Sequence, residues 1–234
     1  MEKQRLDKLI AGTGRWSRRE AKELIRQGRV RVDGVTARSG QDKADPAAVS
    51  VDGEALGWRP YTWVMMNKPA GVLSARSDGR GQTVLDLLPR EFQRLFPVGR
   101  LDKDTEGLLL LTDEGPLAHD LLSPRHHVDK VYYVRTAGEL TEEDCRAFAE
   151  GMVLGELHCL PARLEILSAG EESRAHVTLR EGKFHQVKRM LGALGKPVVY
   201  LERVRMGPLT LDDSLARGAF RILTEEEVKK LRDF

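Results

Sequence analysis

Apolar residues at helical spacing and one tight turn characterise the first sixty residues. Within residues 5–11 the apolar positions fall on one face, which predicts a short helix. Ser17-Arg-Arg-Glu20 is a capping box that predicts the start of a second helix, and Gly28 is a left-handed cap suited to its end. Asp33-Gly34 lies between two short apolar stretches and predicts a hairpin. The pattern therefore predicts a small unit of two helices followed by a hairpin.

The chain changes character near residue 58. Gly and Pro in segment 53–60 predict a linker, and beyond it short apolar stretches alternate with turns. The regular strand–helix alternation of a parallel sheet is missing. We predict an α+β fold, with one domain over 1–58 and a second over 59–234 that has a mixed, mainly antiparallel sheet and flanking helices. The predicted elements of the second domain are strands at 61–66, 108–111 and 177–179, a helix at 184–194 and a last helix that opens with Thr224-Glu-Glu-Glu227.

Composition restricts the class of protein. The 234 residues are 41% hydrophobic and 32% charged, which is typical of a globular chain and not of a disordered one. No stretch approaches the roughly 18 apolar residues of a membrane helix, and the N-terminus lacks the apolar core of a signal peptide. Cys145 and Cys159 have no metal-ligand spacing and suit a reducing compartment. We expect a cytoplasmic monomer that binds neither membrane nor metal.

Charge is uneven along the chain. The whole chain carries +2, but residues 1–40 hold eleven Lys or Arg against five acids, a net +6, so the remainder carries −4. Arg18, Lys22 and Arg26 recur at every fourth residue with no acid on the same stripe, and like charges at that spacing repel. A solvated helix face would explain any one of these charges, but the asymmetry favours a polyanionic partner. The candidate contacts to it are Arg5, Lys8, Arg15, Arg18, Arg19, Lys22, Arg26, Arg29 and Arg31.

Carboxylates concentrate in Gly99-Arg-Leu-Asp-Lys-Asp-Thr-Glu-Gly107, which precedes four leucines. A calcium loop is one alternative, because the acids follow part of the EF-hand spacing. However, the twelfth position is Asp where a bidentate Glu is typical, and no long helix precedes the loop. A polar turn between buried strands is the second alternative. Arg100 favours chemistry, because on an extended backbone it shares a face with Asp102 and could hold that carboxylate ionised.

Two parts of the chain resemble RNA-directed families. Residues 5–34, which include Ser17-Arg-Arg-Glu-Ala21, resemble the S4 domain, a module that binds structured RNA through two helices and the following turn. Gly99-Arg-Leu-Asp102 with Asp104-Thr-Glu-Gly107 and the leucine run resembles the catalytic motif of pseudouridine synthases, and more narrowly the ribosomal small subunit pseudouridine synthase A family. The other matching stretches are Asn67-Lys-Pro-Ala-Gly71, Ser123-Pro-Arg-His-His127, Lys130-Val-Tyr132 and Glu181-Gly-Lys-Phe-His-Gln-Val-Lys-Arg-Met190.

The resemblance implies roles for particular residues. Asp102 would be the catalytic carboxylate, Arg100 would help to flip the uridine out of its helix, and Tyr132 would stack on the flipped uracil. Lys188 lies where related synthases carry a basic residue paired with the catalytic Asp, and as Lys it is a point charge in place of a fork. From the residues alone, Tyr132 could equally be a strand aromatic, and Lys188 part of a solvated helix face. The candidate phosphate contacts in loops are Lys68 and Arg125.

The implied reaction is the isomerisation of uridine to pseudouridine in the 16S RNA of a partly assembled small ribosomal subunit. The reaction rejoins uracil to ribose through C5 without net redox change, so we expect no cofactor and no metal. The chain carries no GxGxxG motif, no P-loop and no Cys/His ligand cluster. Two alternatives stay open: a site in large-subunit RNA, and a non-catalytic assembly factor that binds RNA with an enzyme's fold.

Overall fold

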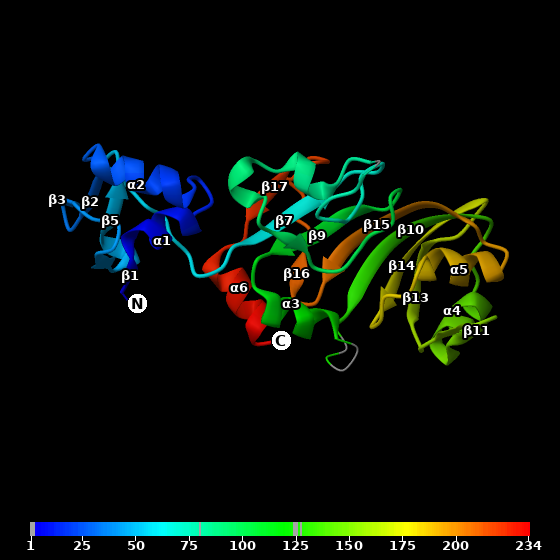
Figure 1. The fold of residues 1–234 in the computed structure, drawn as a ribbon. Coiled ribbons are helices and arrows are strands. Elements are labelled where there is room, and N and C mark those ends of the chain that lie inside the picture. Colours follow the sequence, from blue (N-terminus) through cyan, green and yellow to red (C-terminus); the bar gives the residue numbers. More distant parts are fainter. Residues whose placement is uncertain (1–2, 80, 124–125, 127) are drawn as a thin grey trace. The chain divides into compact units, whose positions relative to one another are not determined.

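The computed structural model describes residues 3–79, 81–123, 126 and 128–234, and Figure 1 shows its ribbon. The chain divides into two compact units. The first comprises Met1–Tyr61 together with Leu85–Leu95, and the second comprises Thr62–Val84 together with Phe96–Phe234. The first unit thus includes a short segment that follows the boundary predicted near residue 58.

Short elements joined by tight turns build the first unit. Ser17 Oγ accepts from the Glu20 N–H and the Glu20 carboxylate accepts from the Ser17 N–H, which confirms the predicted capping box. Asp33 and Gly34 have φ of 50° and 76°, and a type I′ hairpin turn requires positive φ at both positions. The elements are β1 (Gln4–Arg5), α1 (Leu6–Gly12), α2 (Arg18–Arg26), β2 (Val30–Val32), β3 (Val35–Thr36), β4 (Lys43–Ala44), η1 (Pro46–Ala48), β5 (Val49–Val51) and β6 (Glu54–Ala55), with η2 (Val84–Leu87) and η3 (Arg90–Phe92) from the later segment.

The core of the first unit forms where α1 and α2 meet the strands. The antiparallel sheet has the order β3-β2-β5-β6, and its inward residues pack against the apolar faces of the two helices. The linker predicted at 53–60 is wrong in part, because Glu54–Ala55 forms β6 and Leu56 is buried in this core. The core residues are Leu6, Leu9, Ile10, Ala21, Leu24, Ile25, Val30, Ala44, Val49, Val51 and Leu56.

A sheet of nine strands, counted over the described residues, is the scaffold of the second unit. Its path is β13-β14-β10-β15-β9-β7-β17, with β16 beside β15 and β8 beside β9. Only β15 and β9 pair in parallel among these described strands, which confirms an α+β fold with a mixed, mainly antiparallel sheet. The elements are β7 (Trp63–Lys68), β8 (Phe96–Pro97), β9 (Glu106–Thr112), α3 (Gly115–Leu122), β10 (Lys130–Ala137), α4 (Glu142–Glu150), β11 (Met152–Leu154), β12 (Leu157–Cys159), β13 (Arg163–Ser168), β14 (Glu172–Leu179), α5 (Gln186–Ala193), β15 (Val198–Met206), β16 (Leu209–Thr210), β17 (Phe220–Ile222) and α6 (Glu225–Arg232).

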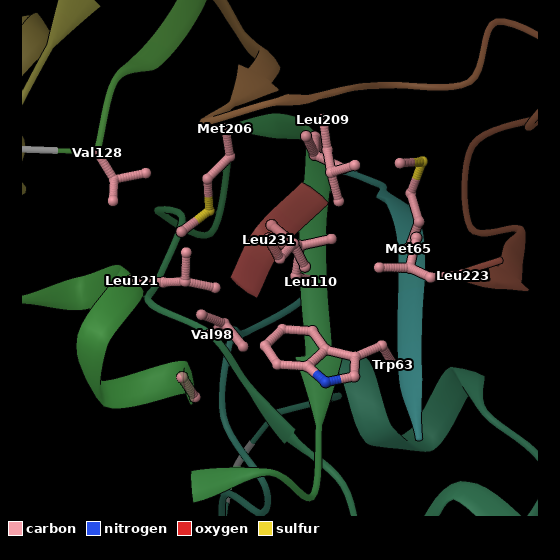
Figure 2. Packing of buried hydrophobic residues seen from close by; sticks show 12 residues of the cluster. Trp63, Met65, Val98, Leu110, Leu121, Val128, Met206, Leu209, Leu223 and Leu231 are labelled. Carbon is pink, nitrogen blue, oxygen red and sulfur yellow. The ribbon is translucent and has the colours of Figure 1, made fainter. Parts of the chain in front are cut away.

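Figure 2 shows a buried apolar cluster of this unit, in which side chains of the sheet meet those of α3 and α6. Trp63 of β7 and Leu110 of β9 lie near Leu121 of α3 and Leu231 of α6. The Trp63 indole N–H donates to the buried carboxylate of Glu114 at 2.7 Å, so the ring's polar atom is satisfied within the core. Over the part of the chain that the structure describes, no helix has the length and apolar character needed to cross a membrane.

Leu110 provides a test of this core. We expect Leu110→Ala to lower the free energy of unfolding by about 2–5 kcal/mol, because truncation leaves a cavity in a fully buried cluster. Urea unfolding followed by tryptophan fluorescence measures the change. As a control, Leu167→Ala on β13 removes an exposed leucine and should cost less than about 0.5 kcal/mol. Equal losses in the two variants would contradict the assignment of the core.

Candidate active site

One row of residues crosses the middle of the large sheet. Lys68, at the end of β7, pairs with Gly107 of β9, and Gly107 pairs with Arg203 of β15. Arg203 in turn pairs with Tyr132 of β10. Directly paired residues present their side chains on the same face of a sheet, so Lys68, Arg203 and Tyr132 share a face, and all three are buried. The four strands run side by side in Figure 1, and the loop that carries Asp102 leads directly into β9.

The ammonium of Lys68 anchors this loop. Burial lowers the pKa of Lys68 to about 8, although three nearby carboxylates act in the opposite direction. The expectation that Lys68 contacts RNA phosphate is wrong, because its side chain is fully buried and its hydrogens are donated to the chain's own backbone. Lys68 Nζ donates to the carbonyl oxygens of Thr105, Pro69, Asp102 and Lys103, at 2.8, 3.0, 3.1 and 3.3 Å.

Ser74 and Gly107 hold the two ends of the same loop. Ser74 Oγ donates to the Leu101 carbonyl at 3.0 Å and accepts from the Leu101 N–H at 3.1 Å. At Gly107 the backbone has a φ of +97°, and a Cβ there would lie 2.4 Å from the carbonyl oxygen of Arg203. Only glycine permits this approach, which brings β9 against β15. Main-chain contacts therefore fix the loop on both sides of Asp102.

Lys188 of α5 is the cation beside Asp102. Its Nζ lies 3.0 Å from Asp102 Oδ2 and 2.5 Å from Asp104 Oδ1, so one ammonium bridges two carboxylates. Burial acts to lower the pKa of Lys188, but the hydrogen bonds to both carboxylates outweigh it and raise that pKa. The hydrogen bond from Lys188 lowers the pKa of Asp104. His185 Nε2 lies 3.6 Å from Asp102 Oδ1, so His185, a residue of the matching stretch 181–190 for which the sequence favoured a contact to RNA or to the backbone, is a neighbour of the site.

Arg100 does not hold Asp102, contrary to the pairing that its spacing predicted. Arg100 is exposed and forms no ion pair within the described part of the chain. Lys188 takes the place beside Asp102 instead. Arg125, the second loop candidate for a phosphate contact, lies outside the described residues, as does His127.

A hydrogen-bonded cluster supports the start of β9 next to this site. Tyr200 Oη donates to the carboxylates of Glu106 and Glu202, at 2.9 and 3.0 Å, and Arg217 binds both acids. Burial, followed by these hydrogen bonds, raises the pKa of Tyr200. A pocket of about 170 Å³ lies along the cluster. The residues that line it are Ala70, Asp104, Glu106, Lys188, Val198, Val199, Tyr200 and Leu201.

Arg203 is a residue that the sequence pattern missed. It is only 2% exposed, and its Nε donates to the Leu108 carbonyl at 2.8 Å. In the described residues, Arg203 Nη2 and Thr105 Oγ1 are the buried side-chain atoms without a hydrogen-bond partner, and both flank the start of β9. Alternating charges in the stretch Leu201-Glu-Arg-Val-Arg205 suggest a solvent-facing strand edge, so the sequence gives no signal of this burial.

The basic residues of the first unit fall into two groups. Three are paired with acids: Arg5 with Asp7, Arg26 with Glu23, and Arg29 with Asp52. The inference that no acid offsets the Arg18–Lys22–Arg26 stripe is therefore wrong at Arg26, because Glu23 lies one turn before it. The other group is exposed and forms no ion pair over the described residues. It comprises Lys8, Arg15, Arg18, Arg19, Lys22 and Arg31.

Comparison with known proteins gives two family matches and several full-length relatives. Residues 62–193 match the RNA pseudouridylate synthase family, and residues 4–54 match the S4 domain. An uncharacterised RNA pseudouridine synthase of Bacillus subtilis is 46% identical over 98% of each chain. The ribosomal small subunit pseudouridine synthase A of Vibrio cholerae is 42% identical over 97% of this chain and 99% of its own. A crystal structure of a pseudouridylate synthase has a TM-score of 0.69 at 38% identity, and the match covers 97% of this chain and 99% of that one.

An S4 domain joined to a mixed sheet with a carboxylate loop at its centre is the architecture of an enzyme that modifies RNA. More narrowly, the chain belongs to the RNA pseudouridylate synthase family, since that family's model covers more than half of it and relatives align over nearly its full length.

Replacing Lys68 should change how stability depends on pH. The pKa of Lys68 is about 8 in the folded chain and about 10.5 ordinarily. Between these values the unfolded chain binds more protons, so this group adds stability as pH rises through that window. In urea unfolding at several pH values, we expect the wild type to gain stability over Lys68→Met between pH 8 and 10.5. The exposed-lysine control Lys229→Met should follow the wild-type curve, and parallel curves for all three proteins would contradict the assignment.

Proposed function

We propose that this enzyme converts a uridine of small-subunit ribosomal RNA into pseudouridine, with Asp102 as the catalytic carboxylate. The observation that carries the proposal is the placement of Asp102, half-buried beside the Lys188 ammonium on a loop anchored by Lys68. The small-subunit substrate is supported by relatives of that name at 42% and 39% identity over nearly the whole chain. Ribosomal RNA as substrate supports action in the cytoplasm, and we expect the monomer to act on a partly assembled particle.

The reaction suits a single ionised carboxylate. The N1–C1′ bond of the uridine breaks, its electron pair stays with the uracil, and a bond forms between C5 and C1′. C5 then gives up its proton and N1 gains one, so the isomerisation balances without a cofactor. Asp102 can begin the reaction by attacking C1′ or by removing a proton from C2′. The Lys188 ammonium lies 3.0 Å from this carboxylate and holds it by an ion pair.

The detached uracil needs a surface on which to turn without escaping. Tyr132 is only 8% exposed and lies in the same sheet row as Lys68, whose ammonium binds the Asp102 loop, so its ring offers a rigid stacking face. Arg100 is exposed and has no ion pair in the described structure, so its guanidinium is available to enter the gap that a flipped base leaves in the RNA. The exposed cations of the S4 domain would hold the flanking RNA by its phosphates.

Asp102→Asn tests the catalytic assignment. We expect this variant to form no pseudouridine on unmodified small-subunit RNA, naked or protein-bound, because the amide can act neither as nucleophile nor as base. Chemical derivatisation and primer extension map the product, and filter binding should give an RNA affinity within about threefold of wild type. The control Asp120→Asn changes an exposed carboxylate on α3 and should keep full activity.

Each other outcome has a definite meaning. Pseudouridine formed by Asp102→Asn would remove Asp102 from the chemistry. A wild-type product found only in large-subunit RNA would overturn the proposed substrate and keep the enzyme class. Tight binding without product in either RNA would favour the assembly-factor alternative.

The S4 domain offers a second test, because its cations differ in pairing. We expect the double variant Arg18→Ala/Lys22→Ala to weaken RNA binding and to reduce the slope of log K against log salt by about 1–2, since both charges are exposed and unpaired within the described residues. Arg26→Ala/Arg29→Ala removes the same charge from residues already paired with Glu23 and Asp52, and should reduce the slope less. Equal slopes in the two double variants would contradict this ranking.

A further inference from the structure

Phe184 is an apolar side chain that the second unit leaves in water. It is 75% exposed, the highest value among the exposed large hydrophobic residues of the described chain. Single exposed apolar side chains are ordinary on protein surfaces, so exposure alone shows nothing. The position of Phe184 is what matters, because it directly precedes His185, a neighbour of Asp102.

The rings of Phe184 and His185 form a flat stack. Their centroids are 3.8 Å apart and their planes differ by 19°. His185 has φ of 52° and ψ of 30°, a left-handed conformation that is uncommon outside glycine. The helix that follows holds this conformation, because the His185 carbonyl accepts from the Arg189 N–H at 2.9 Å and Val187 is buried. One face of the Phe184 ring is covered by His185, while the side chain as a whole is 75% exposed.

This stack stands at the edge of the candidate catalytic carboxylate. His185 Nε2 lies 3.6 Å from Asp102 Oδ1. The imidazole of His185 therefore lies next to the carboxylate, and the Phe184 ring stacks on that imidazole. The two lysines on the same segment as Phe184 are engaged: Lys183 with Glu181, and Lys188 with Asp102 and Asp104. On this segment the exposed feature next to His185 is the ring of Phe184, and an aromatic face suits a base better than a phosphate.

We propose that the exposed face of Phe184 is a stacking platform for an unpaired base adjacent to the target uridine. This inference rests on the proposed function and names a further part of the substrate that the same site holds. When a uridine leaves its helix, the bases beside it lose a stacking partner, and an aromatic side chain replaces that partner. Stacking of this kind tolerates any base, so the platform recognises that a neighbouring base is present and not which base it is.

A coupled substitution in protein and RNA tests the platform. Binding is measured in the Asp102→Asn background, where no turnover occurs, on a short RNA that contains the uridine converted by the wild type. Phe184→Ala should weaken binding roughly 5- to 150-fold, the range expected for one lost base–aromatic stack. An RNA with an abasic nucleotide on one side of the target uridine should bind the Asp102→Asn protein, in which Phe184 is intact, more weakly to a similar extent. Phe184→Ala and that abasic RNA combined should lose no more than either alone.

Matched variants separate stacking from a general loss of structure. Phe184→Tyr keeps a flat ring and should bind within about twofold of the parent, whereas Phe184→Leu keeps the apolar volume without the ring and should lose most of the affinity. Phe234→Ala removes another exposed phenylalanine, at the C-terminus, and should change neither the affinity nor its response to the abasic RNA. If the loss from Phe184→Ala is additive with the loss from an abasic nucleotide on either side of the target, the platform is overturned.

The platform and the proposed function can fail separately. Pseudouridine formed by the wild type with additive losses at Phe184 keeps the function and overturns the platform. If no RNA is converted, the proposed function fails. In that case the platform is tested by the affinity of the protein for unmodified ribosomal RNA. A lower affinity for Phe184→Ala but not for Phe234→Ala supports the platform. Equal affinities of the two variants overturn it.

Discussion

The buried ammonium of Lys68 is the interaction on which the candidate site depends. Four backbone carbonyls converge on its Nζ within 3.3 Å, and oxygens in such an array would repel one another without a cation between them. A buried ammonium would in turn be costly without acceptors for its hydrogens. The end of β7 and the loop before β9 therefore stabilise each other. Because two of the four carbonyls belong to Asp102 and Lys103, the loop's main chain is fixed at the residue whose side chain is proposed to react.

The main chain and the side chain of Asp102 are held by different lysines. Lys68 binds the Asp102 carbonyl from the sheet, whereas Lys188 reaches the carboxylate from α5. One consequence is that the carboxylate can stay partly exposed while its backbone is rigid. Beside it, the contacts of Arg217 and Tyr200 with Glu106 fix the first residue of β9. Preorganisation of this kind places a reactive group without a conformational change at the moment of reaction.

Local signals in the sequence predicted the two helices and the hairpin of the first unit and a minority of the later elements, and long-range placement escaped them. The capping box at Ser17 and the positive-φ turn at Asp33 depend on residues a few positions apart, so their types suffice to predict them. By contrast, Lys68 was taken for a loop residue in contact with RNA. A lysine beside Pro and Gly gives no sign that three carbonyls from a loop 34 to 37 residues later will accept its hydrogen bonds. The helix expected from Phe184 begins at Gln186 instead, since His185 turns left-handed. Arg100 was paired with Asp102 because the two residues are close in sequence, and that spacing gives no sign that Lys188, from a later helix, is the cation beside Asp102.

A lysine suits position 188 because its side chain binds two separate carboxylates. A guanidinium binds one carboxylate best, through two parallel N–H donors in a fixed plane, whereas an ammonium directs three hydrogens at separate acceptors. Lys188 uses this property, with Asp102 and Asp104 at 3.0 and 2.5 Å. The Asp104 side chain is 74% exposed, whereas that of Asp102 is 24% exposed. Asp104 therefore binds the Lys188 ammonium from the solvent side, and Asp102 binds it from the buried side. Asp104 thus helps to hold the ammonium in place, and Lys188 lies beside Asp102 without the bidentate contact by which a guanidinium would cover both carboxylate oxygens.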